Sequence, residues 1–275
     1  MIQTLTPALQ QLDRRLENEL AEMAQDARQW FLTGTGVEHL RVRSDGDTTH
    51  SFDDNLEERL LQAFVQSKLP IRFSSEERAD VDLVQSPELL ALVDPLDGSE
   101  VAARGYPMCS ISVSVVDIAT ATPLLSRIIE VFTSFQYAAS EGHATKNGTR
   151  IAPSRVRSAK DALVVSYFAS KSRMAKVRRS TADWARCRLL INYGGLLDIA
   201  KVGSGQCDAM IEVLNGMVAR EYVAGVHIAQ AAGAVSSTLD GEPIPTLLQR
   251  DARSTFIVAA TPELHGELLA TFAGR

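Results

Sequence analysis

The sequence predicts a mixed fold, with an α+β half over residues 1–152 and an α/β half over residues 153–275. Two patterns support this prediction: candidate strands crowd the first half, whereas strands and helices alternate in the second half. The length of 275 residues also suffices for one large domain or two closely associated ones with a sizeable core.

Two helices are expected before the first strands. Pro7 follows Thr6 as at a helix start, and apolar residues then recur at helical spacing toward Trp30. These apolar residues are Leu9, Leu12, Leu16, Leu20 and Met23. A polar stretch at 41–54 separates this helix from a second one, which is expected from about Asp54 to Phe64.

Several short runs have the composition of strands. Residues 89–93 form a buried-strand run that ends at Asp94-Pro95, and residues 110–116 alternate as in a half-buried strand. Further strands are expected near 71–73 and at 124–132, 135–140, 162–167 and 209–213. Two further helices are expected, one from Gly194 and one over about 220–232.

The composition argues against several classes of protein. Apolar residues make up 45% and charged residues 23%, as in ordinary globular proteins and unlike disordered chains. The net charge of −6 and the lack of a basic run argue against nucleic acid as a partner. No apolar run is long enough to span a membrane, and the start does not resemble a signal peptide, so we expect a cytoplasmic protein. Cys109, Cys187 and Cys207 are widely spaced, and we expect them to be reduced and buried.

Acidic residues gather beside the expected strand ends and helix starts. They form four groups: Asp53 with Asp54, Glu76 with Glu77, Asp94 with Asp97, and Glu221. Mg²⁺ prefers hard oxygen ligands, so carboxylates that converge from separate loops can hold two or three ions. Such ions can activate water and stabilise the leaving oxygen of a phosphate ester. Taken singly, Glu76-Glu77 could instead be a solvated loop, and Asp53 could simply cap a helix.

The segment from Asp94 to Ser99, Asp-Pro-Leu-Asp-Gly-Ser, places two carboxylates on one loop after a buried strand. If a helix follows, the amide groups of Gly98, Ser99 and Glu100 would be available to a phosphate group. An Asx turn followed by a helix cap would produce a similar sequence, so both interpretations stay open.

This segment resembles the DP[IL]DG[TS] signature of the inositol monophosphatase superfamily, which also includes fructose-1,6-bisphosphatases. Other motifs follow in the family order. Ser75-Glu76-Glu77 stands at the position of the family's GEE motif, and Pro107 precedes a strand rich in Ser and Val. The stretch 137–154 resembles the family's Asn-Gly hairpin, and residues 220–225 stand in the place of its WD-x-AAG motif.

The resemblance covers residues 40–240 approximately, and it implies a layered αβαβα sandwich. The spacing of the C-terminal half is most similar to the archaeal-type branch, which acts on both inositol monophosphate and fructose 1,6-bisphosphate. Homodimers are usual in this family, so the resemblance also implies a homodimer.

The resemblance implies metal-binding roles for several residues. Glu76, Asp94 and the main-chain carbonyl of Leu96 would bind a first Mg²⁺ ion. A second ion would share Asp94 and would be completed by Asp97 and Glu221. Glu77 would stand at the position that supports a further ion.

The resemblance also implies catalytic and substrate-binding roles. Asp53 and Ser99 would orient and deprotonate the attacking water, with Glu76 as a third catalytic residue. The amides of Gly98 and Ser99 would hold the phosphate, and Glu212 is a candidate contact to substrate hydroxyl groups.

Three positions depart from the family pattern. Arg220-Glu221 replaces Trp-Asp, so one carboxylate is a methylene longer, and its site could be shifted, weaker or able to take Mn²⁺. Arg220 could also fold back and pair with Glu221, which would oppose metal binding. Ser75 replaces a Gly, and residues 100–104 differ from the segment that follows the signature in relatives.

The sequence therefore predicts a Mg²⁺-dependent phosphomonoesterase that acts on a small sugar or cyclitol phosphate. One alternative is a phosphatase of a nucleotide-derived or specialised-metabolite phosphate. Another is a catalytically silent homologue that binds a phosphorylated ligand. Because Asp94 and Asp97 are both intact, we favour an active enzyme.

Overall fold

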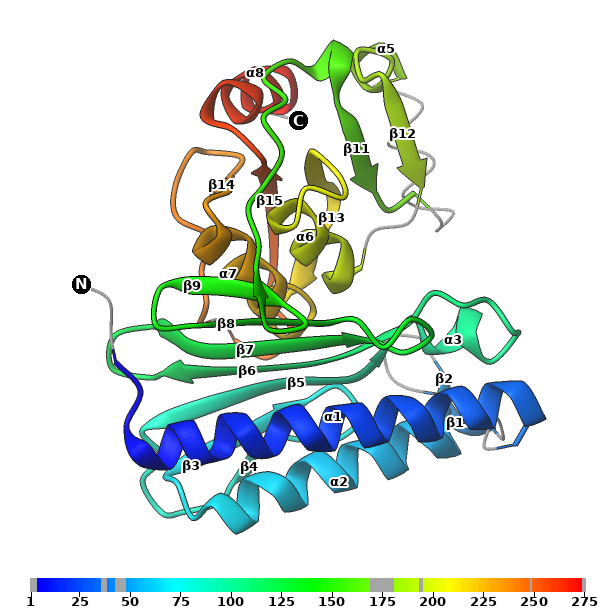
Figure 1. Ribbon diagram of the computed structural model, residues 1–275, viewed down its shortest axis with the longest axis vertical. Helices are drawn as coiled ribbons and strands as arrows, with labels where there is room; N and C mark the ends of the chain where they lie inside the picture. The colour runs from blue at the N-terminus through cyan, green and yellow to red at the C-terminus, as the bar shows by residue number, and fades with distance from the viewer. Residues whose placement is uncertain are drawn as a thin grey trace. The chain divides into compact units, whose positions relative to one another are not determined.

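The computed structural model describes residues 4–35, 39–42, 48–168, 181–192, 195–247 and 249–273. The chain divides into two compact units, Met1–Glu141 and Gly142–Arg275. Each unit has helices packed on a β-sheet (Figure 1). No helix among the described residues is long and apolar enough to cross a membrane.

Two long helices of the first unit lie side by side on one face of its sheet (Figure 1). Helix α1, Pro7–Thr33, begins as expected, and the hydroxyl of Thr6 accepts a hydrogen bond from the amide of Leu9. Helix α2, Ser51–Ser67, follows the short strands β1, His39–Val42, and β2, Thr48–His50. Arg59 of α2 contacts three acidic side chains of α1, Glu19, Glu22 and Asp26. This network ties the two helices together.

The larger sheet has the strand order β10-β9-β8-β7-β6-β5-β3-β4. Its strands are β3, Ile71–Ser75; β4, Val81–Asp82; β5, Leu89–Asp97; β6, Ser110–Asp117; β7, Thr122–Glu130; β8, Gln136–Ser140; β9, His143–Lys146; and β10, Thr149–Arg150. Strands β3 and β5 are parallel, and β5, β6, β7 and β8 pair antiparallel in sequence. Val93, Val113 and Ile129 on one face of this sheet share a hydrophobic core with α1 and α2.

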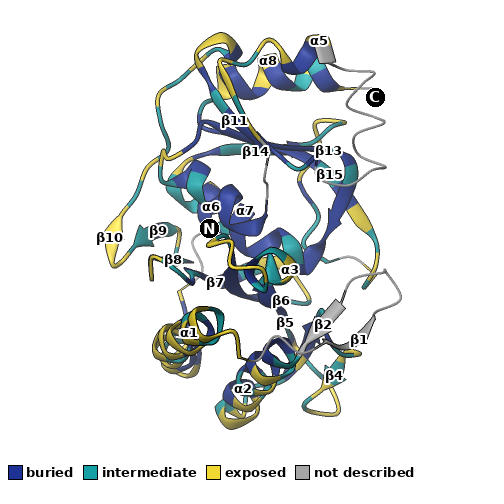
Figure 2. Ribbon diagram, turned by 90° about the vertical axis from the view of Figure 1, so that its right-hand side faces the viewer, coloured by how far each residue is buried: buried dark blue, intermediate teal, exposed yellow. Residues whose placement is uncertain are grey.

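The second unit contains a five-stranded sheet with the order β12-β11-β13-β15-β14. Its strands are β11, Leu163–Ser166; β12, Leu189–Asn192; β13, Ala209–Val218; β14, Val235–Thr238; and β15, Arg253–Ala259. Strands β12, β11 and β13 are parallel, whereas β15 runs antiparallel to both of its neighbours. Helix α8, Pro262–Phe272, covers one face, and α6, Leu196–Gly203, and α7, Val223–Ala232, cover the other (Figure 2).

Two glycines allow α6 and α7 to pack closely. A Cβ atom added at Gly225 would lie 2.6 Å from the carbonyl oxygen of Leu196 and 2.8 Å from the Cβ of Ile199. A Cβ atom at Gly203 would lie 2.9 Å from the Cα of Ala229. The Gly of the 220–225 motif is therefore needed for helix packing, not for turn geometry.

Several expected element boundaries differ from the structure, and two of these differences concern the predicted site. Strand β5 does not end at Asp94 but continues to Asp97, because a register irregularity keeps it paired with β6. The helix expected over 220–232 begins only at Val223, since Ala219–Glu221 form a separate 3₁₀ turn. Both differences lie at residues with predicted functional roles.

His227 on α7 makes the stability of the second unit depend on pH. Burial lowers the pKa of His227 to about 4, below its usual value of 6.5. Between these two values the unfolded chain binds a proton that the folded chain does not. The contribution to stability is therefore present above pH 6.5 and is lost as the pH falls toward 4.

We expect His227→Gln to remove this pH dependence. Between pH 7 and pH 4 the wild type should lose about 2–3 kcal/mol more unfolding free energy than the variant does. Urea unfolding followed by circular dichroism at several pH values measures the difference. Parallel pH profiles for the two proteins would contradict the prediction.

Candidate metal and phosphate site

One predicted metal ligand of the first unit, Asp94, lies in β5, and another, Glu76, directly follows β3. The last pair between these two parallel strands joins Ser75 to Val93, the residues just before Glu76 and Asp94. Asp94 in turn pairs with Ser112 of β6. Because residues paired across a sheet share a face, the register places Asp94 and Ser112 on the same face. This face is opposite to the one that α1 and α2 cover, since Val93 packs with those helices.

A bulge brings Asp97 back to the face that carries Asp94. In a regular strand, residues three positions apart point to opposite faces. Asp94 pairs with Ser112 and Asp97 pairs with Ser110, so two residues of β5 lie opposite one residue of β6 between these pairs. Ser110 and Ser112 are two positions apart and share a face. The extra residue in β5 therefore places both carboxylates on one face.

The bulge is stabilised by Asp94 itself. The amide of Leu96 donates a hydrogen bond to Asp94 Oδ1 at 3.1 Å. Asp94 and Leu96 are both buried. This hydrogen bond forms an Asx turn, the alternative to a functional site considered from the sequence. The turn does not exclude a site, because Asp94 and Asp97 still lie on the same face of the sheet.

The two serines opposite these carboxylates have unsatisfied hydroxyl groups. Among the described residues, the buried Oγ atoms of Ser110 and Ser112 have no hydrogen-bond partner. Farther along the same face, by contrast, Ser114 and Ser126 contact each other at 2.9 Å. Native structures leave few buried polar atoms unpaired, so unpaired hydroxyls beside two carboxylates are the arrangement expected around a bound polar group or ion.

Gly98 and Ser99 form the turn after Asp97. Gly98 has φ 84° and stands at the N-cap of α3, Ser99–Ala102, a single helical turn. This left-handed conformation favours glycine over any residue with a Cβ atom. The amide of Ala102 donates to the carbonyl of Gly98 at 3.0 Å, so a short helix follows the signature.

Asp53 and Glu77 are buried near the start of α2 and after β3, respectively. Arg78, the residue after Glu77, donates a hydrogen bond through Nε to the buried Glu57 of α2. Its Nη2 contacts Glu58 Oε2 at 3.1 Å. This ion pair therefore links α2, which carries Asp53, to the loop after β3, which carries Glu77.

The cysteines have no reactive character in this structure. Burial raises the pKa of Cys109, and the nearby negative charges of Asp97 and Glu130 raise it further. Burial also raises the pKa values of Cys187 and Cys207. All three are free thiols, of which Cys109 and Cys207 are buried, as expected, and Cys187 is half-buried. Raised pKa values disfavour the nucleophilic thiolate.

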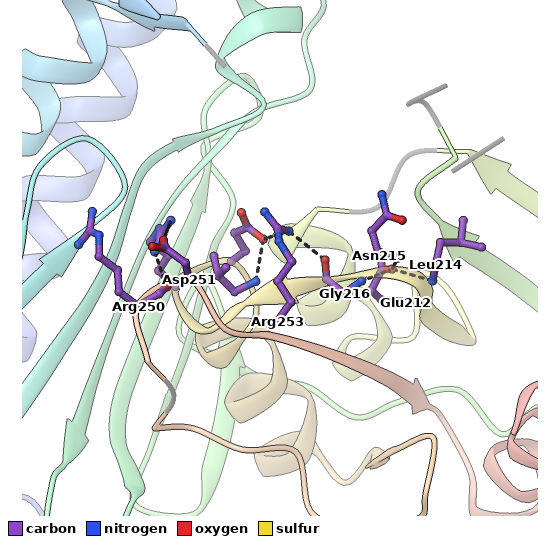
Figure 3. Close-up of polar contacts among 10 residues, drawn as sticks. Glu212, Leu214, Asn215, Gly216, Arg250, Asp251 and Arg253 are labelled. Atoms are coloured by element: carbon purple, nitrogen blue, oxygen red, sulfur yellow. Dashed lines mark hydrogen bonds and ion pairs between the residues drawn. The ribbon is translucent and has the colours of Figure 1, made fainter. Parts of the chain in front are cut away.

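In the second unit, Glu212 holds the irregular middle of β13 (Figure 3). Its side chain is 1% exposed, and Oε1 accepts hydrogen bonds from the amides of Leu214, Asn215 and Gly216 at 2.9, 3.0 and 3.0 Å. The predicted contact of Glu212 with substrate hydroxyl groups stays a prediction. One of its oxygens is committed to the backbone.

Glu221 is contacted by Arg253 and not by the adjacent Arg220. Glu221 Oε2 accepts a hydrogen bond from the amide of Val218 at 3.0 Å and lies 3.9 Å from Arg253 Nη1. Arg253 also donates to the carbonyl of Gly216 at 3.0 Å (Figure 3). The cation beside the predicted ligand therefore comes from β15, which no motif in the sequence signalled.

Arg220 points instead to the turn before β15. Its Nη1 donates to the carbonyl of Arg250 at 3.0 Å, and its Nη2 lies 4.0 Å from Asp251 Oδ1 (Figure 3). Arg220 therefore pairs with this turn and not with Glu221, the alternative pairing considered from the sequence.

Within the described ranges, no three His, Cys, Asp or Glu side chains form a group that could hold a metal ion as they stand. Asp94 and Asp97 share one face of the larger sheet. Their assignment as ligands stays a prediction, as do the roles of Asp53, Ser99 and Glu221.

Glu212 offers a test of the local structure of β13. Glu212→Ala removes the acceptor for three backbone amides, and we expect it to lower the unfolding free energy by about 3 kcal/mol. Glu212→Gln keeps an acceptor oxygen and should cost about 1 kcal/mol. Urea unfolding midpoints measure both losses. A loss for Ala no larger than that for Gln would contradict the assigned hydrogen bonds.

Comparison with known proteins identifies the family. The model of the inositol monophosphatase family matches residues 4–274. A fructose-1,6-bisphosphatase/inositol-1-monophosphatase of Methanothermobacter thermautotrophicus is 26% identical over 244 residues, which cover 85% of this chain and 86% of the relative. A protein of the same description from Thermococcus kodakarensis is 25% identical, covering 92% of this chain and 93% of the relative.

Solved structures show the same fold. The extragenic suppressor protein suhB from Bartonella henselae superposes with a TM-score of 0.84 at 16% identity, over 97% of this chain and 99% of that one. An inositol monophosphatase–fructose 1,6-bisphosphatase superposes with a TM-score of 0.78 at 22% identity, over 94% of this chain and 98% of that one. The predicted fold class, a mixed α+β and α/β layered sandwich, is thereby confirmed. The chain belongs to the inositol monophosphatase family.

Proposed function

We propose that this family phosphatase hydrolyses a small sugar or cyclitol phosphate with the help of Mg²⁺. The observation that carries the proposal is the bulge in β5 that places Asp94 and Asp97 on one face of the sheet, with Glu76 directly after the neighbouring strand β3. The curated relatives are described as acting on fructose 1,6-bisphosphate and inositol 1-monophosphate, so a compact phosphate ester is the first substrate class to test.

The donor groups of the first unit suit Mg²⁺ in their chemistry. Carboxylates and a main-chain carbonyl are the hard oxygen ligands that Mg²⁺ prefers, and the family is generally dependent on it. The unpaired hydroxyls of Ser110 and Ser112 lie beside Asp97 and Asp94, where ligand or water oxygens would satisfy them. When bound, Mg²⁺ would polarise the phosphate and activate the attacking water.

The predicted site residues would each have a separate role. Glu76, Asp94 and the Leu96 carbonyl would hold one ion, and Asp97 would serve a second one with Glu221. Asp53 and the hydroxyl of Ser99 would orient the attacking water and accept its proton. The amides of Gly98 and Ser99 would bind the phosphate oxygens, and Glu77 would support a further ion. Glu212 would contact substrate hydroxyl groups.

Arg253 affects how many metal ions the protein could bind. Its guanidinium lies 3.9 Å from Glu221 Oε2, so a second cation at Glu221 would have to compete with it or displace it. We therefore expect weak occupancy of a second site, and Mn²⁺ could replace Mg²⁺ there. The homodimer and the cytoplasmic location stay expectations.

Phosphate release tests the proposed reaction. The panel comprises inositol 1-phosphate, fructose 1,6-bisphosphate, a nucleoside monophosphate and 3′-phosphoadenosine 5′-phosphate, each with Mg²⁺, with Mn²⁺ and with EDTA. We expect release from a sugar or cyclitol phosphate that EDTA abolishes and that Asp94→Asn lowers by at least about a hundredfold. Release from the adenosine compound alone would favour the nucleotide alternative. No release from any substrate, with ligand binding retained, would favour the silent homologue.

The Arg253–Glu221 pair makes a further prediction. Arg253→Gln should lower the Mg²⁺ concentration for half-maximal phosphate release by about two- to fivefold, the range of an exposed ion pair. This decrease in the required Mg²⁺ concentration should be smaller at high ionic strength. The control is Arg72→Gln, which removes an exposed pair with Asp82 on the first unit. An unchanged or raised Mg²⁺ requirement in Arg253→Gln would contradict the competition.

A further inference from the structure

Arg78 makes an ion pair with a buried carboxylate. Its Nε donates to Glu57 Oε2, and its Nη2 donates to Glu58 Oε2 at 3.1 Å. The side chain of Glu57 is only 1% exposed, whereas that of Arg78 is 30% exposed. Charge-assisted hydrogen bonds of this kind are about twice as strong as neutral ones. The contact therefore restrains the backbone of α2 and the backbone of the loop after β3.

The two partners belong to segments that carry different parts of the predicted machinery. Glu57 lies four residues after Asp53, so both side chains are on the same buried side of α2. Arg78 directly follows Glu76-Glu77, the predicted metal ligands that come after β3. One ion pair thus connects the helix that carries Asp53 to the loop that carries Glu76 and Glu77.

The rest of the structure indicates that Arg78 is the group that compensates Glu57. In the described part of the chain, the second carboxylate oxygen of Glu57, Oε1, is buried and has no hydrogen-bond partner. The other large arginine network of α2 belongs to Arg59, and it joins α2 to α1, not to the loop after β3. A buried carboxylate that depends on one cation keeps that cation in place, because separating them leaves an uncompensated charge.

We propose that Arg78 is a positioning residue for the metal site. Paired with Glu57, it holds the Glu76-Glu77 loop at a fixed distance from Asp53, so that the metal ligands and the residue that orients water form one unit. This inference rests on the proposed function. Arg78 itself contacts neither an ion nor a substrate group in this scheme and acts only through its neighbours.

Metal binding separates positioning from general stability. We would measure Mn²⁺ binding to the whole protein by electron paramagnetic resonance, with Mg²⁺ displacement and without substrate. Arg78→Met should weaken Mn²⁺ binding by about 10–100-fold, the usual effect of losing a group that orients a ligand. Arg78→Lys keeps a cation for Glu57 and should recover most of the affinity.

Arg59→Met is the matched control, since Arg59 is similarly exposed and also pairs α2 with acidic groups. We expect it to lower the melting temperature and leave Mn²⁺ affinity within twofold of wild type. If Arg78→Met does not fold, the double variant Glu57→Gln with Arg78→Met removes both charges. That variant should fold and still bind Mn²⁺ weakly.

Two results would overturn the inference, and they are distinguishable. If Asp94→Asn loses Mn²⁺ binding while Arg78→Met, or the folded double variant, keeps wild-type affinity, Arg78 has only a structural role. If the wild type binds Mn²⁺ no better than Asp94→Asn and releases no phosphate, the proposed function fails, and the positioning role fails with it.

Discussion

The alternation of side chains along a strand is the constraint on which the first unit depends. Asp94 and Asp97 are three residues apart, so an unbroken β5 would place their carboxylates on opposite faces. The extra residue opposite Ile111 removes that conflict, and the amide of Leu96 bonded to Asp94 holds the irregularity in place. Pro95 suits this position because it has no amide proton to leave unpaired. The Asp-Pro-Leu-Asp spacing is thus a consequence of backbone geometry as much as of ligand chemistry.

Buried carboxylates in both units are compensated by different means. In the first unit, Glu57 is paired with Arg78, and Asp94 accepts a backbone amide. In the second unit, Glu212 accepts three backbone amides and needs no cation for this. Burial of a charge is costly unless such partners are present, so each arrangement restricts where the surrounding backbone can lie. Restraint of this kind is what a site with little tolerance in ligand distance requires.

Much of the fold could be predicted from local patterns, while the contacts between distant segments could not. The helix after Pro7 and the strands at 110–116 and 135–140 follow from periodicity, and the structure confirms them. The end of β5 was misplaced because Asp-Pro usually terminates a strand, whereas here pairing with β6 continues through the bulge. The division into domains at 152 and the roles of the acidic residues stay predictions. The sequence did not indicate a role for Arg78 or Arg253, because an isolated arginine is ordinarily a solvated surface residue.

The departures at Arg220 and Glu221 are best understood together with Arg253. Arg220 is buried and donates to the carbonyl of Arg250, which fixes the turn that leads into β15. From the start of β15, Arg253 reaches both the carbonyl of Gly216 and the carboxylate of Glu221. The glutamate, longer by one methylene than an aspartate, still folds back to the amide of Val218. A cation that replaces an aromatic residue therefore does not neutralise its acidic neighbour. It orders a turn, and Arg253, at the start of the strand after that turn, places a positive charge beside Glu221.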